Sequence, residues 1–397
     1  MSESHYLSRA QEYGLAATTA VVTANAYYIH PIISEVADSF SVGQAEIGIV
    51  PALNQLALAL GILLLLPLGD RYSNRRLCIL FVSLQSLAML GMALATQFLV
   101  FTAASTILGF VTVAPYLLPA FASKRVAPER LGQVTAFLTA GVIFGILVAR
   151  VGAGIVAEQF GWRTVYWIAV ALMFAVTLML PVSMRSETSA DKTPTGSYHE
   201  LVLSVFRLTR TYPEVLWSAA IQALNFAMFT ATWLALALHL TSPSLGYGVD
   251  TVGYLAGIAV VSIFATPRLG RLADKIGARR ARVYAALLQL FGVALLYPLG
   301  FSAWALIVPL VLINLVGPSV DVAGRMTFLS LDPSIRTRLT TIYIVIMFVG
   351  GGIGSILGTW SFDTYGWAGT CAAILMASIV VTAMSIMAER SWRARQA

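Results

Sequence analysis

The sequence predicts an all-α membrane protein built from two related bundles of six helices. Hydrophobic residues make up 58% of the chain and charged residues only 11%, and the mean hydropathy is +0.81. Soluble domains carry roughly 25% charged residues. A charged signature occurs twice, with Asp70 and Asp274 at equivalent places and 204 residues apart. The dipeptides Gly161-Trp162 and Gly366-Trp367 repeat at a spacing of 205. Such a recurring offset indicates a duplicated unit.

Twelve apolar runs account for most of the chain. Each is close to or above the roughly 20 residues that a helix needs to cross the hydrocarbon. We expect helices at 14–38, 44–68, 77–97, 99–122, 131–157, 163–184, 213–240, 250–270, 280–300, 303–328, 337–361 and 367–388. The segment 185–212 is polar and rich in Ser, Thr and charges. It predicts a cytoplasmic linker between an N-terminal six-helix bundle, 1–184, and a C-terminal six-helix bundle, 213–397.

The basic residues predict the orientation. If the N-terminus lies in the cytoplasm, 22 of the 25 Lys and Arg residues fall in cytoplasmic segments, as the positive-inside rule requires. Arg163 then lies in an outer loop, and Arg150 and Arg325 lie within spans. We therefore expect a multi-pass protein with both termini cytoplasmic. The same distribution accounts for the net charge of +7 without a nucleic-acid partner.

The repeated signature follows the second span of each half. The second copy, residues 270–280, has the pattern G-x-L-x-D-x-x-G-x-R-R, and the first copy, residues 69–76, has Ser73-Asn74 where a glycine is expected. Together with the twelve spans, this motif resembles the major facilitator superfamily over essentially the whole chain. A finer resemblance, to the bacterial twelve-span drug:proton antiporter branch, rests on Asn25–Pro31, Pro67–Arg71 and Leu331–Arg338.

The resemblance implies a gate at the cytoplasmic face. An acid at a helix end can accept from a basic side chain and from the amides that begin a neighbouring helix. Such a clamp would form in one arrangement of the halves and break in the other. The resemblance therefore assigns gating to Asp70, Arg71, Arg75, Asp274 and Arg279. Ordinary positive-inside charges without a gating role are the alternative.

Four ionisable residues lie at membrane depth, namely His30, Arg150, Asp321 and Arg325. Such groups are costly in the bilayer and are functional hypotheses by default. In the fold that the chain resembles, spans one, four, seven and ten line a central cavity, so His30, Asp321 and Arg325 are the predicted coupling residues. Asp321 and Arg325 are four residues apart and can pair. The alternatives are a self-satisfied ion pair and, for His30, a hydrogen-bonding role at the outer end of its span.

Polar and aromatic side chains on the cavity-lining spans predict the substrate site. Asn25 and Tyr28 are three residues apart and share one helical face. Pro115 and Pro119 can bend the fourth span and expose carbonyl oxygens. The predicted substrate-binding residues are Asn25, Tyr28, His30, Tyr116, Arg150, Asn225, Trp233 and Asn314. Core packing is the alternative for each of the uncharged ones.

Arg150 lies in the middle of the fifth span, after Gly141 and Gly145. Glycines at this spacing let two helices approach closely. The stretch resembles the antiporter motif of this span, but arginine stands near where a proline is expected. The fourth-span arginine that many relatives carry near Ser105 is absent here. A buried arginine needs an acid, carbonyl oxygens or an anionic ligand, so a structural and a ligand-binding role are both open.

We therefore expect a secondary active transporter of small organic molecules that works by alternating access, and specifically a proton-coupled exporter. The alternative is an uptake permease for an organic anion, with Arg150, Arg325 and His30 as the anion site. Short tails disfavour a receptor, and the missing catalytic constellation disfavours an enzyme. The glycine-rich stretch 350–358 lacks the context of a P-loop. We expect no cofactor and no metal. We also expect a monomer in the bacterial inner (plasma) membrane, with substrate, protons and the lipid bilayer as partners.

Overall fold

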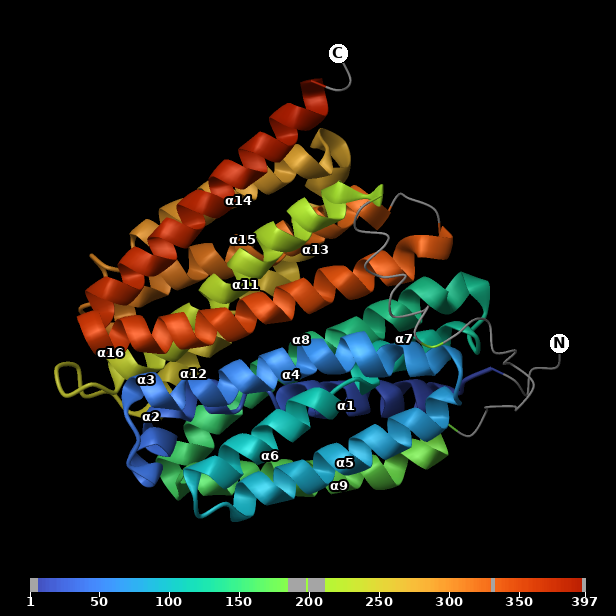
Figure 1. Ribbon diagram of the computed structural model, residues 1–397, viewed down its shortest axis with the longest axis horizontal. Helices are drawn as coiled ribbons and strands as arrows, with labels where there is room; N and C mark the ends of the chain where they lie inside the picture. The colour runs from blue at the N-terminus through green and yellow to red at the C-terminus, as the bar shows by residue number, and fades with distance from the viewer. Residues whose placement is uncertain (1–5, 185–197, 199–210, 330–332, 395–397) are drawn as a thin grey trace.

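The computed structural model is a bundle of α-helices (Figure 1). It describes residues 6–184, 198, 211–329 and 333–394, and these ranges contain no β-strand. The first part of the chain contains α1 (Arg9–Ala24), α2 (Ile29–Phe40), α3 (Gln44–Ile47), α4 (Ile49–Leu65), the 3₁₀ helix η2 (Leu66–Asp70), α5 (Asn74–Leu94), α6 (Phe98–Val111), α7 (Ala114–Ser123), α8 (Pro128–Phe160) and α9 (Trp162–Ser183). The second part contains α11 (Pro213–Leu240), α12 (Val249–Gly257), α13 (Val260–Ile276), α14 (Ala278–Ala294), α15 (Ala303–Leu329) and α16 (Pro333–Ala394). The predicted all-α class is confirmed.

Within the described residues, nine helices are long and apolar enough to cross a membrane, fewer than the twelve predicted runs. The first predicted run is divided into α1 and α2 by a turn at residues 25–28. The ninth is represented by α14, which has 17 residues. The last two are joined in α16, whose helical geometry is interrupted at Gly366. The number of crossing segments therefore stays a prediction.

Two glycines with left-handed backbone angles begin the repeated dipeptides. Gly161 has φ 79° between α8 and α9, and Gly366 has φ 61° within α16. Glycine adopts such angles without the steric cost that a Cβ would add. The tryptophans that follow, Trp162 and Trp367, are 7% and 8% exposed. Each dipeptide therefore turns the chain and anchors the turn with a buried indole ring.

Glycines also mark the closest helix crossings. A methyl group at Gly145 of α8 would overlap the carbonyl oxygen of Ala20 in α1. In the same way, Gly350 and Gly354 of α16 leave no room for a Cβ beside the backbone of α11. Because only a hydrogen atom separates these backbones, the helices approach more closely than larger side chains would allow. The close approach that the glycine spacing of the fifth span predicts is confirmed at Gly145.

The elements fall into two groups in Figure 1, which we call the N-half (α1–α9) and the C-half (α11–α16). The halves contact each other through α8 with α12, α4 and α3 with α16, and α2 with α11. In the figure they converge on the left, where α2, α3 and α12 lie, and diverge toward the right. We call the convergent end, which contains the turn at Ser41, the Ser41 end, and the opposite one the Ser73 end.

Candidate functional site

A break in the first long helix places the first predicted site residues. Asn25 ends α1, and Tyr28 precedes α2. In the turn between them the amide of Tyr27 donates to the carbonyl oxygen of Ala24 over 2.9 Å, and the amide of His30 donates to that of Tyr27 over 3.2 Å. These bonds span three residues rather than four, so the backbone tightens here. Asn25 and Tyr28 are both buried, at 5% and 7% exposed.

Arg150 joins the two halves through its guanidinium face. It lies on α8 and is 2% exposed. Its Cζ atom is 3.5 Å from the ring centroid of Trp233 and 5.3 Å from that of Phe229, both on α11. Its Nε and Nη2 atoms are buried and have no hydrogen-bond partner among the described residues. No described acid forms an ion pair with it. The contact with Trp233 is a cation–π interaction, which leaves the edge of the guanidinium unsatisfied.

His30 lies against the same group of rings. Its ring centroid is 5.2 Å from that of Tyr27 and 6.3 Å from that of Phe229. The side chain is 1% exposed, and neither ring nitrogen has a hydrogen-bond partner in the described parts of the chain. Tyr27 and His30 are both within electrostatic range of Arg150. Predicted residues His30, Arg150 and Trp233 therefore come together, and we call Tyr27, His30, Arg150, Phe229 and Trp233 the central cluster.

The predicted asparagines lie outside the central cluster. The Nδ2 of Asn25 donates to the sulfur of Met173 over 3.0 Å. In the C-half, Asn225 donates to the carbonyl oxygen of Gly317 over 3.2 Å and accepts from Gln289 over 2.8 Å. Asn314 donates to the carbonyl oxygen of Leu310, one turn back on its own helix, over 2.8 Å. The bonds of Asn25 and Asn225 join helices of one half and that of Asn314 stays within α15, which is what the packing alternative for these residues describes.

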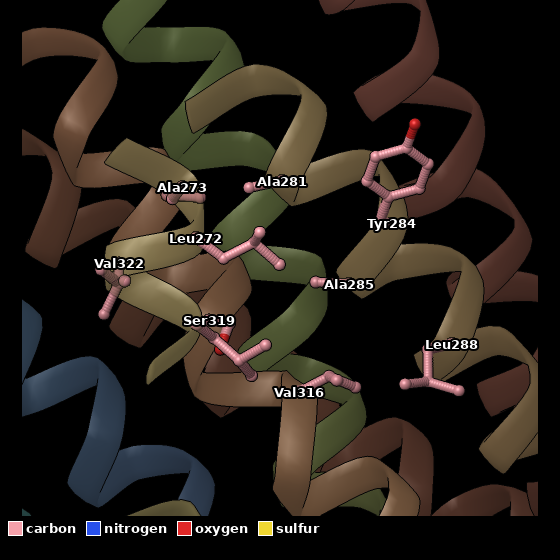
Figure 2. A pocket seen from close by; sticks show the side chains of 12 residues that line it. Leu272, Ala273, Ala281, Tyr284, Ala285, Leu288, Val316, Ser319 and Val322 are labelled. Carbon is pink, nitrogen blue, oxygen red and sulfur yellow. The ribbon is translucent and has the colours of Figure 1, made fainter. Parts of the chain in front are cut away.

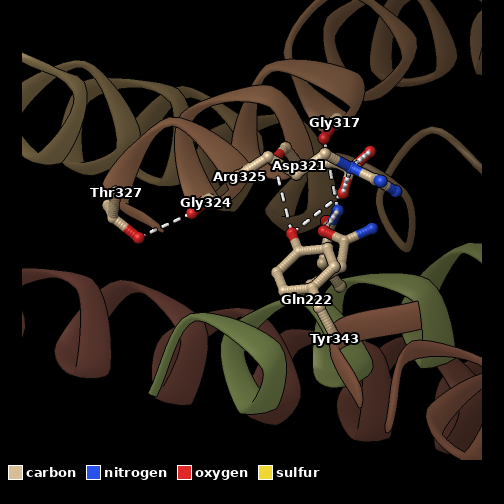
Figure 3. A network of polar contacts seen from close by, with 8 residues as sticks. Gln222, Gly317, Asp321, Gly324, Arg325, Thr327 and Tyr343 are labelled. Atoms are coloured by element: carbon tan, nitrogen blue, oxygen red, sulfur yellow. Dashed lines mark hydrogen bonds and ion pairs between the residues drawn. The ribbon is translucent and has the colours of Figure 1, made fainter. Parts of the chain in front are cut away.

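The predicted pair of Asp321 and Arg325 forms on α15 (Figure 3). The Nε of Arg325 donates to both carboxylate oxygens of Asp321, over 3.0 and 3.1 Å. The hydroxyl of Tyr343 on α16 donates to one of these oxygens over 2.8 Å, and its ring lies 5.0 Å from the guanidinium. Predicted residue Tyr116, on α7 of the N-half, packs toward this group and is within its electrostatic range. The group therefore satisfies its own charges, unlike Arg150.

The predicted gating residues lie at the Ser73 end. Arg75 donates to the carbonyl oxygen of Pro181 over 3.3 Å, and Arg71 follows η2 with its side chain partly buried. The side chain of Asp70 lies outside the described part of the structure, and Asp274 is exposed on α13. Arg279 forms an ion pair with Glu214 in the first turn of α11. Glu214 was not predicted as the partner of Arg279, because it begins a different span, 65 residues earlier in the sequence.

Two cavities of about 220 Å³ lie in the C-half, and neither borders the central cluster. The first is a nearly apolar crevice between α13, α14 and α15 (Figure 2), with the exposed Tyr284 and Leu288 at its edge. The second lies beside Arg279 and Arg282. The described residues contain no group of three or more His, Cys, Asp or Glu side chains that could hold a metal ion.

The contacts that close the Ser41 end were missed from the sequence. The amide of Val249, which begins α12, donates to the carboxylate of Glu158 at the end of α8 over 2.9 Å. The hydroxyl of Ser355 on α16 donates to the carbonyl oxygen of Gly48, before α4, over 2.7 Å. Both bonds cross between the halves. A lone acid near a helix end and a serine in an apolar span carry no signal of such distant partners.

Comparisons with known proteins agree with this architecture. A family model described as "Major Facilitator Superfamily" matches residues 15–323 and 219–397. The "Uncharacterized transporter YgaY" of Escherichia coli O157:H7 is 29% identical over 373 residues, which is 93% of each chain. The "Multidrug resistance protein MdtG" of Salmonella schwarzengrund is 26% identical over 60% of this chain and 59% of its own.

Solved structures show the same fold. A bacterial homologue of the human lysosomal transporter Spinster, in an inward-facing and occupied conformation, aligns with a TM-score of 0.74 at 16% identity, covering 96% of both chains. The nucleoside transporter NupG, as its D323A mutant, aligns with a TM-score of 0.74 at 14% identity, covering 95% of this chain and 99% of its own.

Proposed function

Because the chain belongs to the Major Facilitator Superfamily, we propose that it is a secondary active transporter that exports small organic molecules in exchange for protons. The proposal includes twelve membrane spans in two six-helix bundles, with residues 185–212 as the linker. It places a monomer in the bacterial inner membrane. The relatives that are named for multidrug resistance support export.

The central cluster carries this proposal. Its members come from α2 and α8 of the N-half and from α11 of the C-half. The charge of Arg150 is buried, and its Nε and Nη2 atoms have no hydrogen-bond partner among the described residues. Such a charge is expensive at membrane depth, which supports a binding role there. In parallel-repeat transporters, substrate binds where the repeats meet and the halves rock around it. The contacts between halves at the Ser41 end are suited to forming in one state and breaking in the other.

The basic residues support the orientation of this cycle. The loops and first helical turns at the Ser73 end contain Arg71, Arg75, Lys124 and Arg279, and the cytoplasmic side is enriched in such residues. With this end in the cytoplasm, Glu158 and Ser355 close the outer side. The exposed Asp274 and the ion-paired Arg279 then lie where a cytoplasmic gate would act.

Transport into everted vesicles tests direction and coupling together. Everted vesicles that contain the protein are incubated with either radiolabelled 2-naphthoate or the neutral 2-naphthamide in the outer solution. We expect accumulation of at least one probe above that in vesicles without the protein, and its loss when a protonophore collapses the pH gradient. The motivation is His30 and Asp321, which are ionisable residues at membrane depth. Accumulation that ignores the protonophore but requires a sodium gradient would reassign the coupling ion.

A second candidate is an uptake permease for an organic anion. The edge of Arg150 that has no partner among the described residues favours an anionic substrate, but it does not distinguish uptake from export. Right-side-out vesicles separate the two candidates, because an uptake permease accumulates 2-naphthoate in them and an exporter does so only in everted ones.

A further inference from the structure

We propose that Arg150 and His30 bind the anionic group of the substrate, while the partly exposed ring of Phe229 contacts its flat apolar body. The inference rests on the proposed transport function and specifies its substrate class. The ligand is a small organic acid, with one carboxylate or phosphate on an aromatic or other flat apolar group.

The unsatisfied atoms of Arg150 have the geometry of a carboxylate receptor. Nε and Nη2 present two parallel N–H groups on one edge of the guanidinium. Both are buried and lack a hydrogen-bond partner within the described residues. Two parallel donors match the two oxygens of a carboxylate or of a phosphate in a bidentate bond. An acid from the protein could fill this role, but the described ion pairs of the membrane region engage Arg325 with Asp321 rather than Arg150.

The aromatic rings hold this edge in place. Trp233 covers one face of the guanidinium at 3.5 Å, and Phe229 lies 5.3 Å from it. A guanidinium that stacks on a ring is fixed in orientation while its edge stays available for hydrogen bonds. Trp233 is 2% exposed and serves to hold the guanidinium, whereas Phe229 is partly exposed and offers apolar surface to a flat ligand. The positive edge and the apolar wall are therefore adjacent, as an aromatic acid requires.

His30 supplies a second polar contact on the same ring system. It lies against Phe229 on the side of α2, with both ring nitrogens unpartnered among the described side chains. One of these nitrogens carries a proton even in the neutral imidazole and can donate to the anion. His30 and Arg150 belong to the N-half and Phe229 to the C-half. A ligand held by all three would bridge the halves, so its affinity would depend on their arrangement.

Binding to the purified protein in detergent tests the site without transport. Isothermal titration calorimetry compares 2-naphthoate, naphthyl phosphate, inorganic phosphate and 2-naphthamide. We expect the two aromatic anions to bind at least about tenfold more tightly than the amide, and inorganic phosphate to bind weakly because it lacks the apolar body. Arg150→Lys should weaken 2-naphthoate about tenfold or more, since lysine keeps the charge but not the fork. His30→Gln should weaken it roughly fivefold, as expected for one hydrogen bond.

Arg163→Lys is the matched control. Arg163 also lies over a tryptophan, with its Cζ 4.3 Å from the ring of Trp162, but it donates to the carbonyl oxygen of Ala95 over 3.0 Å. This variant should bind 2-naphthoate like the parent protein. Size-exclusion chromatography and thermal unfolding show which variants are folded. Should Arg150→Lys fail to fold, Phe229→Leu serves instead and should weaken naphthoate more than inorganic phosphate.

Three results would overturn the anion site. They are equal affinities for 2-naphthoate and 2-naphthamide, no binding of either aromatic anion up to about 10 mM, and equal losses in Arg150→Lys and Arg163→Lys. Transport of 2-naphthamide without naphthoate binding would refute the anion site and leave the transport proposal intact. Naphthoate binding that requires Arg150, with no transport in either vesicle orientation, would support the anion site and refute the transport proposal.

Discussion

Charged residues at membrane depth have two different environments in this protein. Asp321 and Arg325 satisfy each other with help from Tyr343, whereas Arg150 stacks on Trp233 and keeps an unused edge. The ion pair lies within α15, and the hydrogen bond from Tyr343 ties it to α16. An incomplete set of bonds is a property that a binding site would use, because the ligand supplies the missing partner.

Asp321→Asn tests whether the paired group is structural. The substitution removes the charge that holds Arg325 and should lower the free energy of unfolding by about 2 kcal/mol, the range for hydrogen bonds to charged groups. Tyr343→Phe removes one bond from the same carboxylate and should cost about 1 kcal/mol. Thermal unfolding in detergent measures both. If Asp321→Asn leaves stability unchanged and abolishes only the protonophore response of transport, the pair acts in coupling rather than in stability.

The residue scale also shows what local sequence can predict about the site. Asp321 and Arg325 are one helical turn apart, so their spacing was sufficient to predict the pair. Tyr343 lies 22 residues from Asp321, on another helix, and only the packing of α15 against α16 brings it there. In the same way, membrane depth marked Arg150 and His30, but their common contact with Phe229 depends on how two halves meet.

Helix crossings in this protein are set by where glycine lies. Gly145 packs on the backbone of α1, whereas Gly152, two turns further along α8, has no heavy atom within 4 Å of where a Cβ would lie. The same residue type is therefore required at one position and free at the other. This contrast gives an internal control for the packing of α8.

Gly145→Ala should destabilise the protein, and Gly152→Ala should not. A methyl group at position 145 would overlap the carbonyl oxygen of Ala20, and overpacking of this kind costs about 1–3 kcal/mol. Alanine at position 152 should be neutral or stabilising by up to about 1 kcal/mol, because it is the better helix former. Unfolding midpoints and the monodisperse fraction in detergent compare them. Equal effects at the two positions would mean that α1 and α8 can move apart without loss of stability.

The long helices were predictable because apolar length has one physical meaning in a bilayer. The positions at which these helices break were harder to predict, because proline was the main local signal. Pro115 predicted a bend in the fourth span, and the break between α6 and α7 falls just before it, at residues 112–113. Pro31 follows the turn at residues 25–28 and has no amide to donate to the carbonyl oxygen of Tyr27, so this proline marks the break. Tertiary contacts can compensate for such a break when it lines protein rather than lipid.

The two halves are held at the Ser41 end by a few polar bonds together with apolar packing. Glu158 accepts from the first amide of α12, where the helix dipole favours a negative charge. Ser355 donates to Gly48 on the opposite side of the junction. Because these bonds cross between the halves, their strength sets the balance between closed and open states at this end.

Glu158→Gln combined with Ser355→Ala should shift this balance. Spin labels at Thr96 and Phe301 report on the Ser41 end, and labels at Tyr72 and Lys275 report on the Ser73 end. These four positions are exposed, so cysteines introduced there can be labelled. The native Cys78 and Cys371 are 0% and 4% exposed and should not react with the label. The double variant should lose about 1–2 kcal/mol of the free energy that favours the closed state, which raises the open-to-closed ratio about fivefold to thirtyfold. The distance between the two labels at the Ser41 end should then increase.

Asp250→Asn is the control for the spin-label distances. Asp250 lies near the same junction but accepts from the amide of Thr251 within its own half, over 2.7 Å. It should leave both distance distributions unchanged. Unaltered distances in the double variant would show that apolar packing alone closes the Ser41 end.

The stacking of Arg150 on Trp233 has a consequence for biosynthesis. The two residues are separated by 83 positions in the chain, so at roughly 5–20 residues per second the ring is made roughly 4–17 s after the arginine. During that interval α8 must enter the bilayer with an uncovered charge, which opposes insertion by roughly 2.5–3.5 kcal/mol. The first half of the nascent chain therefore stays incomplete at its centre until a helix of the second half arrives to cover it.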